Sequence, residues 1–155
     1  MKNRVKLSAI LFLLFAACTA SYAAPKRPWH IEVKTDGGFS GRGAGDYALD
    51  SDAKVTARLM NGKACTFTIS PEELARFETI LGAARPERWK PSYVPEEACC
   101  DRFHYALTYD EAGTVRTTEW IDSPLPMPKD LVAVKDAIVG GEPSSVRMLA
   151  NERCQ

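Results

Sequence analysis

Histidine is scarce in this 155-residue chain, which contains only His30 and His104. Both fall in segments that alternate like strands, where an imidazole that faces solvent or packs beside aromatic rings is the ordinary case. The chain also lacks a GK[ST] or GxGxxG phosphate loop, because the glycines of Asp36-Gly37-Gly38 stand in neither context. It has no internal repeat and no low-complexity tract. These absences argue against an enzyme, and we expect no catalytic residue and no cofactor.

The only long apolar run lies near the N-terminus, from Leu7 to Ala17. Three basic residues precede it within the first six positions, and Ser21-Tyr22-Ala23 follows with small residues at the −3 and −1 positions of a cleavage site. The run is too short to cross a bilayer as an ordinary helix. This order is typical of a signal peptide. We therefore expect residues 1–23 to be removed and the protein to be periplasmic or secreted, with no transmembrane span.

The N-terminal segment also contains a second cleavage motif, of the lipoprotein type. Phe15-Ala16-Ala17-Cys18 ends like a lipoprotein site, in which Cys18 would become the lipidated N-terminal residue. The position that usually carries Leu holds Phe15 here, so cleavage near Ala23 is the favoured interpretation. Lipidation of Cys18 remains the alternative. It would hold the domain at the surface of the bacterial envelope without a spanning helix.

Removing residues 1–23 from the 155-residue chain leaves 132 residues, enough for one domain with a modest core. The removed segment holds three of the 20 basic residues and none of the 20 acidic ones, so the remainder has a net charge of −3. A weakly acidic domain lacks the basic surface that nucleic acid requires. We exclude nucleic acid as a partner.

Cys65, Cys99, Cys100 and Cys154 remain after the first 23 residues are removed. An even number of cysteines in an oxidising compartment predicts disulfides. A bond between the adjacent Cys99 and Cys100 would close a strained eight-membered ring. We therefore expect one of these two to bond to Cys65 and the other to Cys154.

Three groups of residues contain the residue types of catalytic or metal sites. Cys100 with His104 has the residue types of a thiol nucleophile and its base, and Glu96-Glu97 is a pair of carboxylates. Cys99, Cys100, Asp101 and His104 include metal-binding types, but adjacent cysteines in an extended chain point to opposite sides and seldom chelate one ion together. Bonded sulfur and a solvated acidic turn are the simpler interpretations, and we expect no metal site.

Alternating apolar and polar residues predict the strands. Asn61-Gly62 and Glu111-Ala112-Gly113 mark two hairpin turns, whereas the glycine-rich segment 39–52 is expected to be a loop. The expected strands are 29–34, 54–59, 64–69, 103–109 and 114–120.

Two helices are predicted between and after these strands. Ser70 can cap a helix, Pro71 suits its first turn, and Glu73 completes a capping box before an apolar face that reaches Ala84. A shorter helix is expected over 129–139, where two glycines end it.

The order of elements predicts an α+β domain over residues 24–141. We expect a small antiparallel sheet of about five strands, formed by two hairpins and an opening strand, to pack against one main helix, with a short C-terminal helix. Residues 142–155 are expected to be a polar tail that Cys154 ties to the domain.

Three motifs, in this order and spacing, resemble the emfourin family, the proteinaceous inhibitors associated with protealysin and other thermolysin-like metalloproteases. Ile31 to Phe39 is similar to the family's opening strand and Gly-Gly-Phe turn, and Ser70 to Phe77 to its Pro-Glu-Glu helix. Asp101 to Thr108 is similar to its Asp-x-Phe-x-Tyr strand. The resemblance spans residues 29–139. The signal peptide, the cysteines and a glycine-rich insertion after Phe39 depart from the pattern.

The resemblance implies a binding protein that inhibits a thermolysin-like metalloprotease, and the signal peptide implies that this protein is exported. Asp36, Gly37, Gly38 and Phe39 would form the partner-binding turn, in which Phe39 supplies an aromatic anchor. The alternative for Phe39 is a place in the core. The alternative for the whole chain is a non-catalytic envelope module that contacts another envelope protein and has no protease target, because a shared fold does not carry a shared function.

Overall fold

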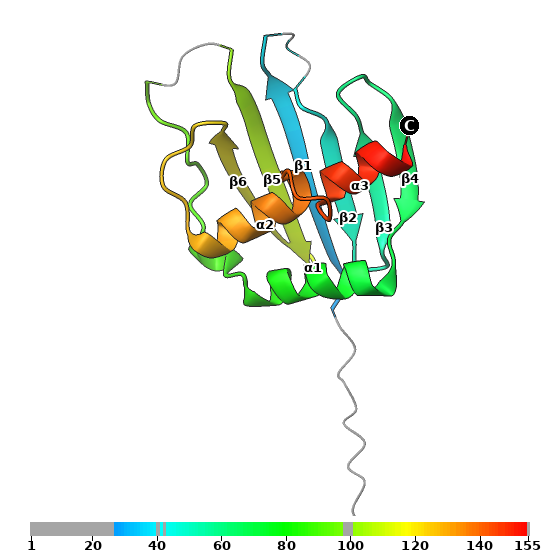
Figure 1. The fold of residues 1–155 in the computed structure, drawn as a ribbon. Helices are drawn as coiled ribbons and strands as arrows, with labels where there is room; N and C mark the ends of the chain where they lie inside the picture. The colour runs from blue at the N-terminus through cyan, green and yellow to red at the C-terminus, as the bar shows by residue number, and fades with distance from the viewer. Residues whose placement is uncertain (1–26, 40, 42, 98–100, 155) are drawn as a thin grey trace, which may run out of the picture.

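Six strands form one antiparallel sheet in the order β4-β3-β2-β1-β5-β6 (Figure 1). The computed structural model describes residues 27–39, 41, 43–97 and 101–154. The elements are β1 (Trp29–Gly37), β2 (Asp46–Asp50), β3 (Lys54–Arg58), β4 (Ala64–Thr68), α1 (Pro71–Ala83), the 3-10 helix η1 (Pro86–Arg88), β5 (Phe103–Glu111), β6 (Thr114–Ile121), α2 (Lys129–Val139) and α3 (Val146–Arg153). The α+β class expected from the sequence is confirmed, with six strands in place of about five.

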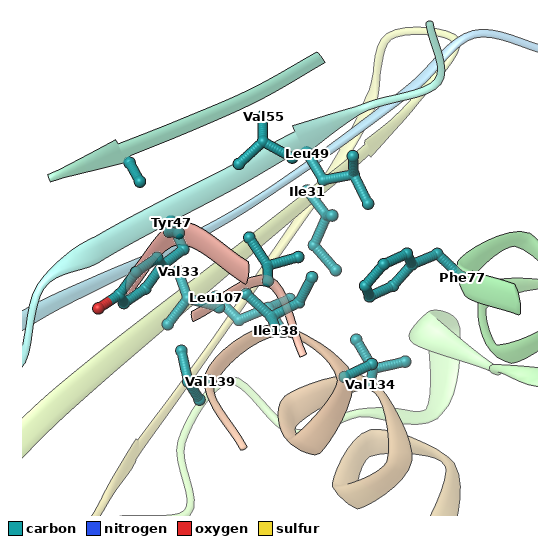
Figure 2. Packing of buried hydrophobic residues seen from close by; sticks show 14 of the residues in the cluster. Ile31, Val33, Tyr47, Leu49, Val55, Phe77, Leu107, Val134, Ile138 and Val139 are labelled. Atoms are coloured by element: carbon teal, nitrogen blue, oxygen red, sulfur yellow. The ribbon is translucent and has the colours of Figure 1, made fainter. Parts of the chain in front are cut away.

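The helices share one face of the sheet. In Figure 1, α2 and α3 cross the middle of that face and α1 runs along its lower end. Figure 2 shows the strand side chains facing Phe77 of α1 and Val134 and Ile138 of α2. All three of these helix side chains are at most 2% exposed. The core therefore lies in one layer between the sheet and the helices.

Strand β2 was not predicted, because segment 39–52 was expected to be a loop. β2 lies between β1 and β3, with Leu49 opposite both Ile31 and Val55. Its three central residues, Tyr47, Ala48 and Leu49, are all buried. The strand is only five residues long and closely follows Gly41, Gly43 and Gly45, which favour a loop.

The end of the chain is also more ordered than a polar tail. Ser145 accepts a hydrogen bond from the Met148 N–H at the start of α3. Val146, Leu149 and Ala150 of this helix are buried, so α3 contributes to the core although most of its residues are polar. Helix α3 contacts β2 and β3, the strands nearest β4.

The disulfide pairing expected from the sequence is wrong. Cys65 of β4 is bonded to Cys154, with a Cα–Cα distance of 6.0 Å, and neither pairs with Cys99 or Cys100. The reason is α3, which places Cys154 next to β4 instead of leaving it on a loose tail. Cys99 and Cys100 lie outside the described residues, as do Cys18 and the expected signal peptide.

The capping box of α1 forms as predicted and is extended by α3. Ser70 and Glu73 exchange both hydrogen bonds of the box. The Arg153 guanidinium donates to Glu73 Oε1 over 2.7 Å. Burial acts to raise the pKa of Glu73, but the Ser70 N–H and Arg153 outweigh it, so this pKa lies below its ordinary value.

A lowered carboxylate pKa gives a pH-dependent prediction for Glu73→Gln. The carboxylate of Glu73 stabilises the fold above its unfolded-state pKa, and this contribution is lost as pH falls through the lower folded-state pKa. Glutamine keeps the capping role but loses the ion pair. We expect the free energy of unfolding to fall by about 0.5–1 kcal/mol at pH 7 and to depend less on pH in the acid range.

Urea unfolding from pH 7 to pH 3 measures this effect. Glu72→Gln, an exposed carboxylate in the same first turn of α1, is the matched control. Equal pH profiles for the two variants would contradict the role given to the Glu73–Arg153 pair.

The β5–β6 hairpin contains a strained alanine. Ala112 has φ of 52° and Gly113 has φ of 86°, so both turn residues are left-handed, as in a type I′ turn. Ala112 is exposed and its N–H donates to the Pro28 carbonyl. Asparagine tolerates this conformation better than alanine.

Ala112→Asn is therefore expected to raise the free energy of unfolding by about 0.5–1 kcal/mol. Gly113→Ala in the same turn should change it in the opposite direction, because a Cβ there meets no other atom within 4 Å and only the positive φ opposes it. Thermal unfolding followed by circular dichroism measures both variants. Shifts of the same sign would show that the turn conformation is wrong.

Candidate functional site

The turn expected to bind a partner lies at the C-terminal end of β1. Gly37 and Gly38 have φ of 74° and 68°, in the left-handed region that favours glycine. A Cβ at Gly37 would overlap the Arg102 carbonyl oxygen, and one at Gly38 would lie 2.5 Å from the Phe103 ring. The two glycines are therefore required both by the backbone conformation and by the close approach of β5.

Phe39 projects from this turn into solvent. Its side chain is 96% exposed, the highest value among the exposed large hydrophobic residues. Phe39 is therefore not part of the core, which was the alternative considered from the sequence. A phenylalanine in this position exposes apolar surface that contributes nothing to folding, and such exposed residues often mark interaction sites.

A buried threonine braces the loop that follows. Thr35 is 5% exposed, and its hydroxyl donates to the Gly45 carbonyl and accepts from the Ala44 N–H, both over 2.7 Å. The Thr35 N–H donates to Asp46 Oδ1 over 3.0 Å, and Arg58 binds the other oxygen of the same carboxylate. The two ends of the loop are therefore held together by polar contacts.

Backbone hydrogen bonds complete the brace. The Gly38 N–H donates to the Arg102 carbonyl over 2.9 Å, and the Gly43 N–H donates to the Gly37 carbonyl over 3.1 Å. A Cβ at Gly43 would overlap the Thr35 carbonyl, so Gly43 packs tightly against β1. Gly38 and Gly43, on the two sides of Phe39, are thus both held by backbone hydrogen bonds.

Tyr47 of β2 also contacts the segment that follows Phe39. Its hydroxyl donates to the Ala44 carbonyl over 3.3 Å. Burial raises the pKa of Tyr47, and the nearby Asp46 carboxylate raises it further, although Arg147 acts in the opposite direction. The hydroxyl therefore stays protonated and remains a donor at neutral and moderately alkaline pH.

The sequence identified Asp36, Gly37, Gly38 and Phe39 but missed the residues that hold them. Thr35 continues the inward-facing series of β1 after Ile31 and Val33. A polar residue at an inward position was the signal available for Thr35. Asp46 had no such signal, because its role depends on the pairing of β2, which was not predicted.

The two histidines occupy separate places on the sheet. His30 Nδ1 lies 2.7 Å from Asp50 Oδ1, and His104 is opposite both Asp36 and Ile121. Cys100, the thiol considered beside His104, lies outside the described residues, and Glu96 and Glu97 are exposed. Within the described part of the chain, no group of three or more His, Cys, Asp or Glu side chains is arranged to hold a metal ion.

A cleft of about 880 Å³ opens at the other end of the sheet, between α1, the start of β1 and the end of β5. Trp29 and Tyr109 lie in its wall, and arginine and glutamate side chains surround them. Its lining contains no histidine, cysteine or serine. The cleft is therefore remote from Phe39 and differs from it in chemistry. No helix among the described residues is long and apolar enough to span a bilayer.

Comparison of the chain with models of protein families, with curated proteins and with solved structures finds no match.

Proposed function

We propose that this chain is an exported, emfourin-like binding protein that inhibits a thermolysin-like metalloprotease. Its turn of Asp36, Gly37, Gly38 and Phe39 would enter the active-site cleft of the protease. The single observation that carries the proposal is the exposure of Phe39, 96%, on a turn whose two sides are fixed by hydrogen bonds.

The bracing distinguishes an inhibitor from a substrate. Exposed loop tips are preferred sites of proteolytic cleavage, so an unbraced loop with an aromatic tip would be cut. Here Gly43, Ala44 and Gly45 are already held by Thr35 and by the Gly43–Gly37 hydrogen bond in the unbound protein. Such preorganisation lowers the entropy lost on binding and favours a stable complex.

Processing of the N-terminus would leave the binding turn free, because the two lie at opposite ends of β1. Strand β1 enters the sheet at Trp29 and leaves it at Gly37, at the opposite end (Figure 1). Phe39 follows this second end of the strand. Removal of residues 1–23, or lipidation at Cys18, would therefore leave the turn accessible.

Titration of a thermolysin-like protease with the protein recovered from the periplasm tests this function. Peptidase activity should fall in proportion to added protein and reach its minimum near one equivalent, and mass spectrometry should find the added protein uncut. Digestion of the protein, or full activity at micromolar excess, would contradict the proposal and favour the non-catalytic envelope module.

A further inference from the structure

The cleft beside α1 contains two nearly buried polar side chains that have no partner. Trp29 and Tyr109 are each 8% exposed, and both line the cleft. Neither the Trp29 indole N–H nor the Tyr109 hydroxyl makes a hydrogen bond to another described residue. Both atoms remain open to solvent, because no fully buried side-chain nitrogen or oxygen in the described part of the chain lacks a partner. Polar groups at this depth are usually paired, so the two atoms are available to a ligand.

The register of the sheet places these two side chains close together. Trp29 is opposite Glu111, and Ile31, the next inward-facing residue of β1, is opposite Tyr109. Both aromatic residues lie on the helix face of the sheet, at the end where β1 begins and α1 passes (Figure 1). Burial raises the pKa of Tyr109, and the Glu111 carboxylate raises it further. The hydroxyl therefore remains a hydrogen-bond donor at neutral pH.

The cleft continues past Tyr109 along the β5–β6 hairpin. A hollow of about 120 Å³ shares Tyr109 and Glu111 with the cleft and adds Thr114 and Arg116 of β6 to its lining. The cleft itself, of about 880 Å³, is within the usual size of small-molecule sites, about 300 to 1,000 Å³. An elongated site of this size accommodates a ligand built from several units.

Charges of the two signs balance around the cleft and its extension. Three arginines and three glutamates line them: Arg27, Arg85, Arg116, Glu78, Glu87 and Glu111. All but Glu78 lack an ion pair with another described residue. A ligand with a single charge of either sign would meet like charges here. A hydroxyl both donates and accepts, so it can pair with a guanidinium, a carboxylate, an indole N–H or a phenol.

We propose that this cleft binds a neutral oligosaccharide. Its hydroxyl groups would accept hydrogen bonds from Trp29 and Tyr109 in the depth of the cleft and would pair with the arginines and glutamates of the rim. Such a chain is the ligand class in which almost every polar group is both a donor and an acceptor. The inference is independent of the proposed inhibitory function, because the cleft and Phe39 lie at opposite ends of β1.

Titration followed by NMR tests the site with three probes, maltotetraose, cellotetraose and chitotetraose. At least one of them should shift the indole N–H resonance of Trp29. The indole resonance of Trp120 should stay in place, because this residue is 2% exposed and stacks on Tyr105, away from the cleft. Trp120 therefore serves as an internal control for changes that affect the whole protein.

Two variants then test the contacts with the sugar that binds. Tyr109→Phe removes only the hydroxyl and should weaken binding about five-fold. Glu111→Gln, at an exposed position on the rim, should weaken it about three-fold without affecting the core. Tyr105→Phe is the matched control, since it makes the same change as Tyr109→Phe on the same strand outside the cleft, and it should leave the affinity unchanged.

Three results would overturn the site. The first is no shift of the Trp29 resonance with any of the three sugars at millimolar concentration. The second is equal affinity of Tyr109→Phe, Glu111→Gln and Tyr105→Phe for the sugar. The third is a larger Trp29 shift with tetraglycine, a zwitterionic chain, which would assign the cleft to a peptide. Inhibition of the protease is measured separately and bears only on the turn of Phe39.

Discussion

Replacing Cys65 and Cys154 together by alanine is expected to lower the free energy of unfolding by about 4 kcal/mol. The bond joins residues 89 positions apart, so it closes most of the domain into one loop. In the chain-entropy description, a closed loop of this length restricts the unfolded chain by about 4–5 kcal/mol, and observed values run from about 2 to 5 kcal/mol.

Removing the bond also weakens the docking of α3. Cys154 is 4% exposed and caps this helix, whose buried residues include Val146 and Ala150. Without the disulfide, α3 would be held to the sheet only by its buried side chains and by the hydrogen bonds from Arg153 to Glu73 and to the Thr68 carbonyl, so we expect α3 to loosen before the sheet unfolds.

Guanidinium unfolding of the double variant measures this loss. A reductant would act on every disulfide of the chain, whereas the double variant removes only the Cys65–Cys154 bond. Peptide mapping of the unmodified protein under non-reducing conditions should recover the peptides of Cys65 and Cys154 linked to each other. A loss below about 1 kcal/mol, or a linkage of Cys65 to Cys99 or Cys100, would contradict the position of α3.

Phe39→Ala is expected to weaken binding to a thermolysin-like protease about thirty-fold while leaving the melting temperature nearly unchanged. Truncating an interface anchor typically costs about 2 kcal/mol or more, which corresponds to that factor. The side chain is 96% exposed, so the fold gains almost nothing from it.

Inhibition constants and melting curves of Phe39→Ala, measured beside Val115→Ala, check both parts of this prediction. Val115→Ala also removes an exposed apolar side chain but from the far end of the sheet. A sharp fall in the melting temperature of Phe39→Ala would place this residue in the fold after all. Equal inhibition by the two variants would remove Phe39 from the binding site.

Local patterns predicted the parts of the fold that local interactions decide. Strand β5 and the capping residues Ser70 and Glu73 are confirmed, because a pleated strand and a helix N-terminus depend on residues within a few positions. β2 and α3 could not be predicted in this way. The short β2 is defined by its neighbours on both sides, and α3 is held by buried contacts with distant elements and by Cys65.

The same distinction applies to the site. Gly37 and Gly38 indicated a turn before Phe39, since consecutive glycines permit positive φ. The contacts that brace this turn were not predictable, because they join Thr35 to Gly45 and to Asp46, which pairs with Arg58 of β3. The disulfide pairing was missed for a related reason, since it required the position of α3.

Photo-crosslinking from position 39 tests the central claim most directly. A benzoylphenylalanine placed at Phe39, in a complex with a thermolysin-like protease, should crosslink to residues that line the active-site cleft. The same probe placed at Val115 should give no crosslink to the protease. Equal crosslinking from both positions, or crosslinks from position 39 that fall only outside the cleft, would contradict the binding mode proposed for this protein.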